Sequence, residues 1–110
     1  MTRYVAAAAL ALLISLPSGF AGAEPAAARQ GELIYRLRQD CGSCHGLTLK
    51  GGLGPPLLPA AMAKRDDAHL VDVILDGIPG TPMPPWAFEI SRGEAEWLVR
   101  RLKAGLDDDS

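Results

Sequence analysis

The sequence has few aromatic side chains, only two cysteines and no excess of basic charge. Aromatic residues make up 5% of the 110 residues, while 12 glycines and 9 prolines favour turns over large core side chains. The 11 basic and 13 acidic residues give a net charge of −2, which argues against a binder of nucleic acid. A chain this short forms at most one domain. Its sparse core predicts that a disulfide, a metal or a large apolar cofactor completes the interior.

Residues 1–23 have the pattern of a secretory signal peptide. Arg3 supplies the positive end, an apolar run extends from Val5 to Leu16, and residues 21–23 (Ala-Gly-Ala) fit a cleavage site. A membrane anchor is the alternative, but this run is shorter than the roughly 20 residues that a spanning helix needs. We therefore expect export to the periplasm, with a mature domain at residues 24–110 and no membrane span in the mature form.

Apolar spacing predicts an all-α domain with three main helices and a short one. The first helix is expected from residue 30 into the cysteine motif, and the short helix from residue 59 to residue 64 or 65. Another helix is expected between an N-cap at Asp66 or Asp67 and a terminal glycine at position 77. The last should begin with a capping box at residues 91–94 and end at residue 105. No segment alternates polar and apolar residues for long enough to predict a strand.

The chemistry is concentrated at Cys41, Cys44 and His45, which form the motif Cys-x-x-Cys-His. On one helical turn these residues share a face, so two thiols can bond to the vinyl groups of a haem while the imidazole approaches the iron. The spacing is the signature of covalent haem c attachment. A redox dithiol of the thioredoxin kind is one alternative, but it would require a strand before the motif. A structural disulfide is another, but closing so short a loop would constrain the unfolded chain very little.

Met83 is the candidate for the second axial position on the haem iron. It lies in residues 80–86 (Gly-Thr-Pro-Met-Pro-Pro-Trp), where prolines fix φ and reduce the entropy lost on holding the sulfur in place. A thioether favours ferrous iron and raises the potential, as in electron-carrying cytochromes. The alternatives are that Met83 only fills space in a turn, or that another residue binds the iron. Of the other candidates, we expect Met62 to pack in the core and His69 to lie at the surface.

The sequence resembles small single-haem class I cytochromes c and, within them, the cytochrome c55X family. The shared motifs are Cys-x-x-Cys-His at 41–45, Gly-Pro-Pro-Leu at 54–57 and Met-Pro at 83–84, with their flanking segments. The resemblance implies a cytochrome c fold in which the Pro55 carbonyl accepts a hydrogen bond from His45 and Leu57 contacts the haem. One departure is that Leu37 occupies the place of a usual aromatic residue, while Tyr35 lies two positions earlier.

The resemblance also implies a periplasmic carrier of single electrons that is not itself an enzyme. Proteins of this family occur with the haem-cd-type nitrite reductase of denitrifying bacteria. The expected partners are therefore that reductase, an enzyme that matures its special haem, or other periplasmic redox proteins. Arg36, Arg38 and Lys50 flank the haem motif and are candidates for steering an acidic partner. An open sixth position, as in a gas or peroxide sensor or enzyme, is the alternative function, and the oligomeric state (a monomer or a helix-swapped dimer) stays open.

Protein exported in a host with haem-attachment machinery should begin at or near Glu24 and carry one haem. Mass spectrometry of the periplasmic fraction is expected to give the mass of residues 24–110 plus one haem that survives acid–acetone extraction. The Cys41→Ser/Cys44→Ser variant should lose that haem. A full-length chain in the membrane fraction, or haem retained by the double variant, would contradict this interpretation.

Overall fold

All helices lie in the second of the two ranges, 2–14 and 24–106, that the computed structural model describes. In chain order they are α1 (Ala27–Arg36), η1 (Leu37–Cys41), α2 (Gly42–His45), α3 (Pro59–Met62), α4 (Asp67–Asp76) and α5 (Arg92–Ala104). Because α1, η1 and α2 follow one another without a break, the described residues hold three main helices and a short one. They hold no strand, so the predicted all-α class is confirmed. None of the described helices is long and apolar enough to cross a bilayer.

Residues 2–14 are extended and exposed. The expected cleavage site at 21–23 and the acidic tail at 107–110 lie outside the described residues.

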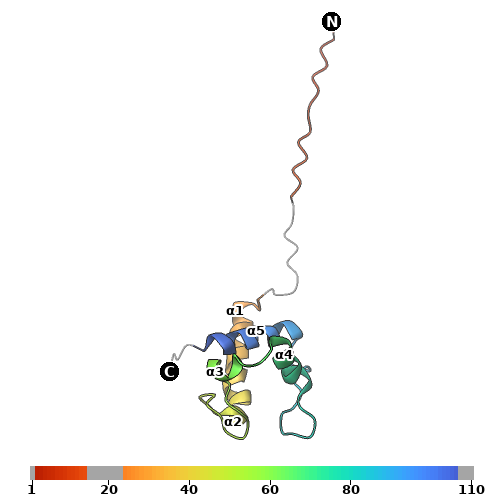
Figure 1. The fold of residues 1–110 in the computed structure, drawn as a ribbon. Coiled ribbons are helices and arrows are strands. Elements are labelled where there is room, and N and C mark those ends of the chain that lie inside the picture. The colour runs from red at the N-terminus through yellow and green to blue at the C-terminus, as the bar shows by residue number, and fades with distance from the viewer. Residues whose placement is uncertain (1, 15–23, 107–110) are drawn as a thin grey trace.

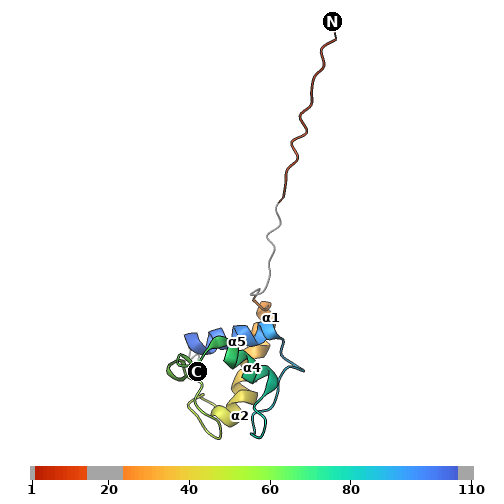
Figure 2. The same cartoon turned by 45° about the vertical axis from the view of Figure 1, so that its right-hand side comes forward.

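Helix α5 is the element around which the others are arranged. It contacts α1, α3 and α4, and the two views show it lying across the helical body (Figures 1 and 2). The loop that follows α2 and the loop that follows α4 project from the same end of this body in both views. The first of these loops follows directly on the helical segment that bears Cys41, Cys44 and His45 and contains Pro55 and Leu57, and the second contains Met83.

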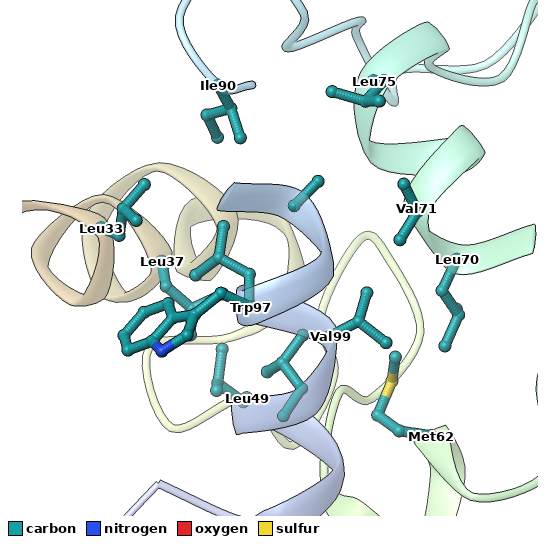
Figure 3. Packing of buried hydrophobic residues seen from close by; sticks show 13 residues of the cluster. Leu33, Leu37, Leu49, Met62, Leu70, Val71, Leu75, Ile90, Trp97 and Val99 are labelled. Carbon is teal, nitrogen blue, oxygen red and sulfur yellow. The ribbon is translucent and has the colours of Figure 1, made fainter. Parts of the chain in front are cut away.

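One apolar cluster joins the helices to the loop after α2 (Figure 3). Its buried members are Leu33, Leu37, Leu49, Met62, Leu70, Val71, Leu75, Ile90, Ala95, Trp97, Leu98, Val99 and Leu102. Only one of these thirteen side chains, Trp97, is aromatic, and the guanidinium of Arg101 lies 5.8 Å from the centroid of its ring. The cluster is therefore built mainly of medium-sized aliphatic side chains, as the composition predicts.

The helix before the cysteines departs from the uniform α-helical spacing that the sequence predicts. Through η1 the backbone is a π-helix, which closes with a hydrogen bond from Gly42 N to the Leu37 carbonyl. A π turn holds more residues than an α turn and is common at functional sites. Leu37 is only 2% exposed and belongs to the core, whereas Tyr35 is 67% exposed. Leu37 thus fills the core position four residues before Cys41, where the class I cytochromes c that the sequence resembles usually have an aromatic residue.

The predicted caps are present, although two helix bounds differ from expectation. Asp66 caps α4 by accepting a hydrogen bond from His69 N at 3.2 Å, and α5 begins with a capping box in which Ser91 and Glu94 bond to each other's backbone. Helix α1 begins at Ala27, earlier than predicted, because the residues at 27–29 (Ala-Ala-Arg) are strong helix formers. Helix α3 begins at Pro59 as predicted but ends at Met62, and the following residues form turns.

Glu94 also connects the first helix to the last. Its carboxylate accepts hydrogen bonds from the guanidinium of Arg29, and this guanidinium lowers the pKa of Glu94 to about 2. Because the pKa is lower in the folded protein than in the unfolded chain, Glu94 stabilises the fold fully above about pH 4.5. This contribution is lost as the pH falls toward 2.

The Glu94→Gln variant should therefore lose about 1–2 kcal/mol of stability at neutral pH, since it removes an ion pair and weakens the capping box. Denaturant unfolding of the haem-loaded protein at pH 7 and near pH 2 measures the free energy of unfolding of the variant and of the wild type. The difference between these two free energies should be smaller at the lower pH. Glu32→Gln is the control, because Glu32 pairs with the same arginine but is exposed. If Glu94→Gln and Glu32→Gln lost the same stability at both pH values, the stabilising role of Glu94 would be refuted.

Candidate functional site

The loop after α2 wraps around the end of the helix that carries the cysteine motif. The last carbonyls of a helix have no partner within it. Here the Cys44 carbonyl accepts a hydrogen bond from Gly54 N, and the His45 carbonyl accepts one from Gly51 N, each at 2.8 Å. Leu57 N donates to the Leu49 carbonyl at 2.9 Å, which ties the end of the loop to the core. The motif and its loop therefore form one hydrogen-bonded unit.

His45 is held in one orientation by this loop. Its Nδ1 lies 2.7 Å from the Pro55 carbonyl oxygen, the contact that the family resemblance implies. A carbonyl oxygen can only accept, so Nδ1 carries the hydrogen and Nε2 keeps its lone pair for a metal. Such a bond also raises the basicity of a liganding imidazole. The geometry therefore leaves Nε2 of His45 free to bind a metal.

Gly54 allows the imidazole to lie this close to the loop. A Cβ atom at this position would lie 2.8 Å from both Cε1 and Nδ1 of His45, closer than real Cβ contacts come. The glycine that the sequence places before the two prolines is therefore needed by the histidine beside it.

Cys41 and Cys44 are free thiols, and both are half-buried. Burial, with a smaller contribution from the charge of Asp40, raises the pKa of Cys41 to about 11. A dithiol oxidoreductase needs the opposite shift, because its attacking sulfur must be a thiolate near neutral pH. The raised pKa and the absence of a strand among the described residues both disfavour the thioredoxin-like alternative.

The Met83 loop is attached to the end of α4. Ile78 N donates to the Met83 carbonyl at 3.2 Å, which closes the loop on itself. Trp86 N donates to the Ile74 carbonyl at 3.0 Å, so the far side of the loop returns to α4. Gly77 has a φ of 67°, and a Cβ there would lie 2.7 Å from the Met83 carbonyl oxygen. The close packing at Gly77 adds to the stiffness that the prolines provide. Met83 itself is half-buried.

The structure separates Met83 from the two other candidate ligands. Met62 is buried in the apolar cluster, as predicted, and His69 is exposed in the first turn of α4. Leu57 is half-buried against the same cluster.

Sequence reasoning missed the apolar residues at the surface of the two loops. Leu47 is 70% exposed and Leu53 is 77% exposed, and both lie in the loop after the histidine. Ile78 is exposed in the Met83 loop. Contiguous exposed apolar side chains are typical of ligand sites, and these three lie in the two loops that project from the same end of the helical body (Figures 1 and 2). Their position close to glycines and prolines was the available signal, because a solvated loop would more often carry polar residues there.

Comparison with known proteins identifies the family. A protein described as cytochrome c55X from Paracoccus denitrificans is 55% identical over 96 residues, which cover 86% of this chain and 93% of that protein. The chain belongs to the cytochrome c55X family. A cytochrome c55X from Pseudomonas aeruginosa is 52% identical and is covered over 82% of its length. Residues 26–100 also match the family described as "Cytochrome C oxidase, cbb3-type, subunit III".

Solved structures agree with this identification. The chain is similar to a protein described as c-type cytochrome NirC, with 54% identity and a TM-score of 0.72 over 74% of this chain and 95% of that one. It is also similar to part of a solved structure described as dihydro-heme d1 dehydrogenase NirN in complex with DHE, with 36% identity and a TM-score of 0.60 over 73% of this chain but only 17% of that one. Among known sequences, a dihydro-heme d1 dehydrogenase from Pseudomonas aeruginosa is 40% identical over 72 residues, which are 14% of its length. The chain thus resembles a whole small cytochrome and one segment of a larger enzyme.

A cytochrome c family implies a haem, and the residues present fit one. The two thiols lie three residues apart on the continuous helical segment of η1 and α2, and His45 follows with Nε2 available. Exposed apolar side chains border the two loops, as a large apolar group requires. Cys41, Cys44, His45 and Met83 are the residues that would hold it.

Gly54→Ala should displace the His45 ring and weaken its bond to Pro55, because the added methyl occupies the space of the imidazole. We expect a lower yield of haem-loaded protein, measured as haem absorbance per polypeptide, and an altered ferric spectrum. Gly93→Ala is the control, since a Cβ at position 93 meets nothing within 4 Å. Normal loading and an unchanged spectrum for Gly54→Ala would contradict the packing argument.

Proposed function

We propose that this cytochrome c55X family member is a periplasmic carrier of single electrons. Cys41 and Cys44 bind one haem c covalently, and His45 and Met83 are its axial ligands. The observation that carries the proposal is the 2.7 Å contact between His45 Nδ1 and the Pro55 carbonyl. That bond orients a histidine directly after two cysteines, which is the arrangement that a covalent haem needs.

The haem, when bound, supplies one-electron chemistry between ferric and ferrous iron. The protein's own contribution is to keep the two ligands in place while the charge on the iron changes. The Pro55 carbonyl holds the Nδ1 proton of His45, and the prolines beside Met83 limit how far the thioether can move. If His45 and Met83 both bound the iron, a haem held here would have no position free for a substrate, and this favours a carrier over an enzyme or a gas sensor.

The comparisons support a role in denitrification. Relatives with more than 50% identity are named cytochrome c55X, and one similar solved structure is named NirC. The similarity to part of dihydro-heme d1 dehydrogenase favours a partner that works on haem d1 or on the nitrite reductase that uses it. We propose that the carrier exchanges electrons with one of these proteins.

The charges around the motif indicate which basic residue could attract such a partner. Arg36, one of the three basic residues predicted to steer it, is ion-paired with Glu89, and Asp40 lies 4.0 Å from the same guanidinium. Its charge is therefore compensated locally. Lys50 is exposed in the loop after the histidine, so it is the better candidate for steering an acidic partner.

The proposed location rests on residues 1–23, whose pattern is that of a cleaved signal peptide. The mature domain of residues 24–110 would then begin just before α1, which starts at Ala27.

The Met83→Ala variant tests the carrier function. Loss of the thioether should lower the potential by roughly 0.1 V or more, remove the weak long-wavelength ferric band of a methionine–iron bond, and let ferrous iron bind CO. It should also slow electron exchange with a haem-cd-type nitrite reductase in stopped-flow mixing. Met62→Leu is the control, because it preserves volume in the core and leaves the iron untouched. A Met83→Ala protein with the spectrum and potential of the wild type would refute the proposed ligation.

A further inference from the structure

Two arginines of α1 reach the segment that follows the Met83 loop. Arg29 and Arg36 lie two helical turns apart, so they share one face of α1. Arg29 Nη2 donates a hydrogen bond to the Glu89 carbonyl oxygen at 2.9 Å. Arg36 forms an ion pair with the Glu89 carboxylate. The two arginines therefore hold the same residue, one by its backbone and the other by its side chain.

Glu89 lies in the turn that ends the Met83 loop. Glu89 N and Ile90 N donate to the Trp86 carbonyl at 3.0 Å and 2.9 Å, so residues 86–90 form a closed turn. Trp86 N is bonded to α4, and Ile90 is buried in the apolar cluster. A displacement of Glu89 would therefore move the backbone turn that fixes one side of the Met83 loop.

Arg36 also lies next to the haem-attachment turn. It is the last residue of α1, and its guanidinium is 4.0 Å from the carboxylate of Asp40, the residue before Cys41. The Asp40 carbonyl accepts a hydrogen bond from Ser43 Oγ at 2.7 Å, which ties η1 to α2. Arg36 is thus placed between the helix that bears the cysteines and the turn that ends the Met83 loop.

We infer that Arg36 is a positioning residue for the axial methionine. Its ion pair with Glu89 joins the helix that carries Cys41 and Cys44 to the Met83 loop and favours the state in which Met83 binds the iron. The inference rests on the proposed ligation by His45 and Met83. The backbone bonds of the loop described above lead to α4, so the Arg36–Glu89 pair adds a separate tie to the helical segment that bears the two cysteines.

The expected effect is modest and depends on salt. The side chains of Arg36 and Glu89 are 31% and 36% exposed, so water and ions partly screen their attraction. Exogenous imidazole competes with Met83 for ferric iron, and its apparent affinity therefore reports how firmly the methionine is held. Loss of overall stability alone would not change this competition in a protein that stays folded.

Imidazole titration of the ferric, haem-loaded protein at fixed pH and low salt tests the inference. Arg36→Gln and Glu89→Gln should each raise the apparent affinity for imidazole by about two- to fivefold, the range of a partly exposed ion pair. The double variant should show no more than the larger single effect, because both substitutions remove the same interaction. The difference from wild type should shrink at high salt.

The matched controls are Arg92→Gln and Asp72→Asn. These residues form an exposed ion pair at 3.0 Å between α5 and α4, and neither lies in the Met83 loop, so they should leave imidazole affinity unchanged. Unchanged affinity in both Arg36→Gln and Glu89→Gln, or fully additive effects in the double variant, would overturn the inference. If Met83→Ala binds imidazole with wild-type affinity, the proposed ligation fails, and this inference fails with it.

Discussion

The hydrogen bond between His45 and the Pro55 carbonyl is the interaction on which the rest of the site depends. It decides which imidazole nitrogen is free, and it fixes the plane of the ring relative to the two cysteines. For the carbonyl to be there, the chain must turn back immediately after α2. That turn is possible because the loop satisfies the last carbonyls of the helix and because Gly54 leaves room for the ring. The ligand, the loop and the helix end are therefore one structural unit.

The Met83 loop is held by similar means from another part of the chain. A glycine with positive φ brings it against the end of α4, and backbone hydrogen bonds return it to the same helix. Helix α5, which contacts both α4 and α1, sets the distance between the two units. The helical core thus serves mainly as a frame for two stiff loops. An electron carrier benefits from such a frame, because ligands that move little when the iron changes charge keep the cost of reorganisation low.

Local signals in the sequence predicted the helices well and the long-range ties poorly. The N-cap at Asp66 and the capping box at Ser91 depend on neighbouring residues, so their patterns can be read directly from the sequence. The π-helical segment before Cys41 could not be predicted, because whether a turn widens depends on how Leu37 fits the core. The pairing of Arg36 with Glu89 could not be predicted either, because charges far apart in the sequence meet only after the helices have packed together. The contact to Pro55 was anticipated through family resemblance, since a proline-rich turn alone does not identify an acceptor.

A crystal structure of the ferric, haem-loaded protein tests the central claim most directly. The account predicts His45 Nε2 and the Met83 sulfur on opposite sides of the iron, thioether bonds to Cys41 and Cys44, and an unbroken hydrogen bond from His45 Nδ1 to the Pro55 carbonyl. An iron bound by Met62 or His69, or one whose sixth position is open to solvent, would contradict it.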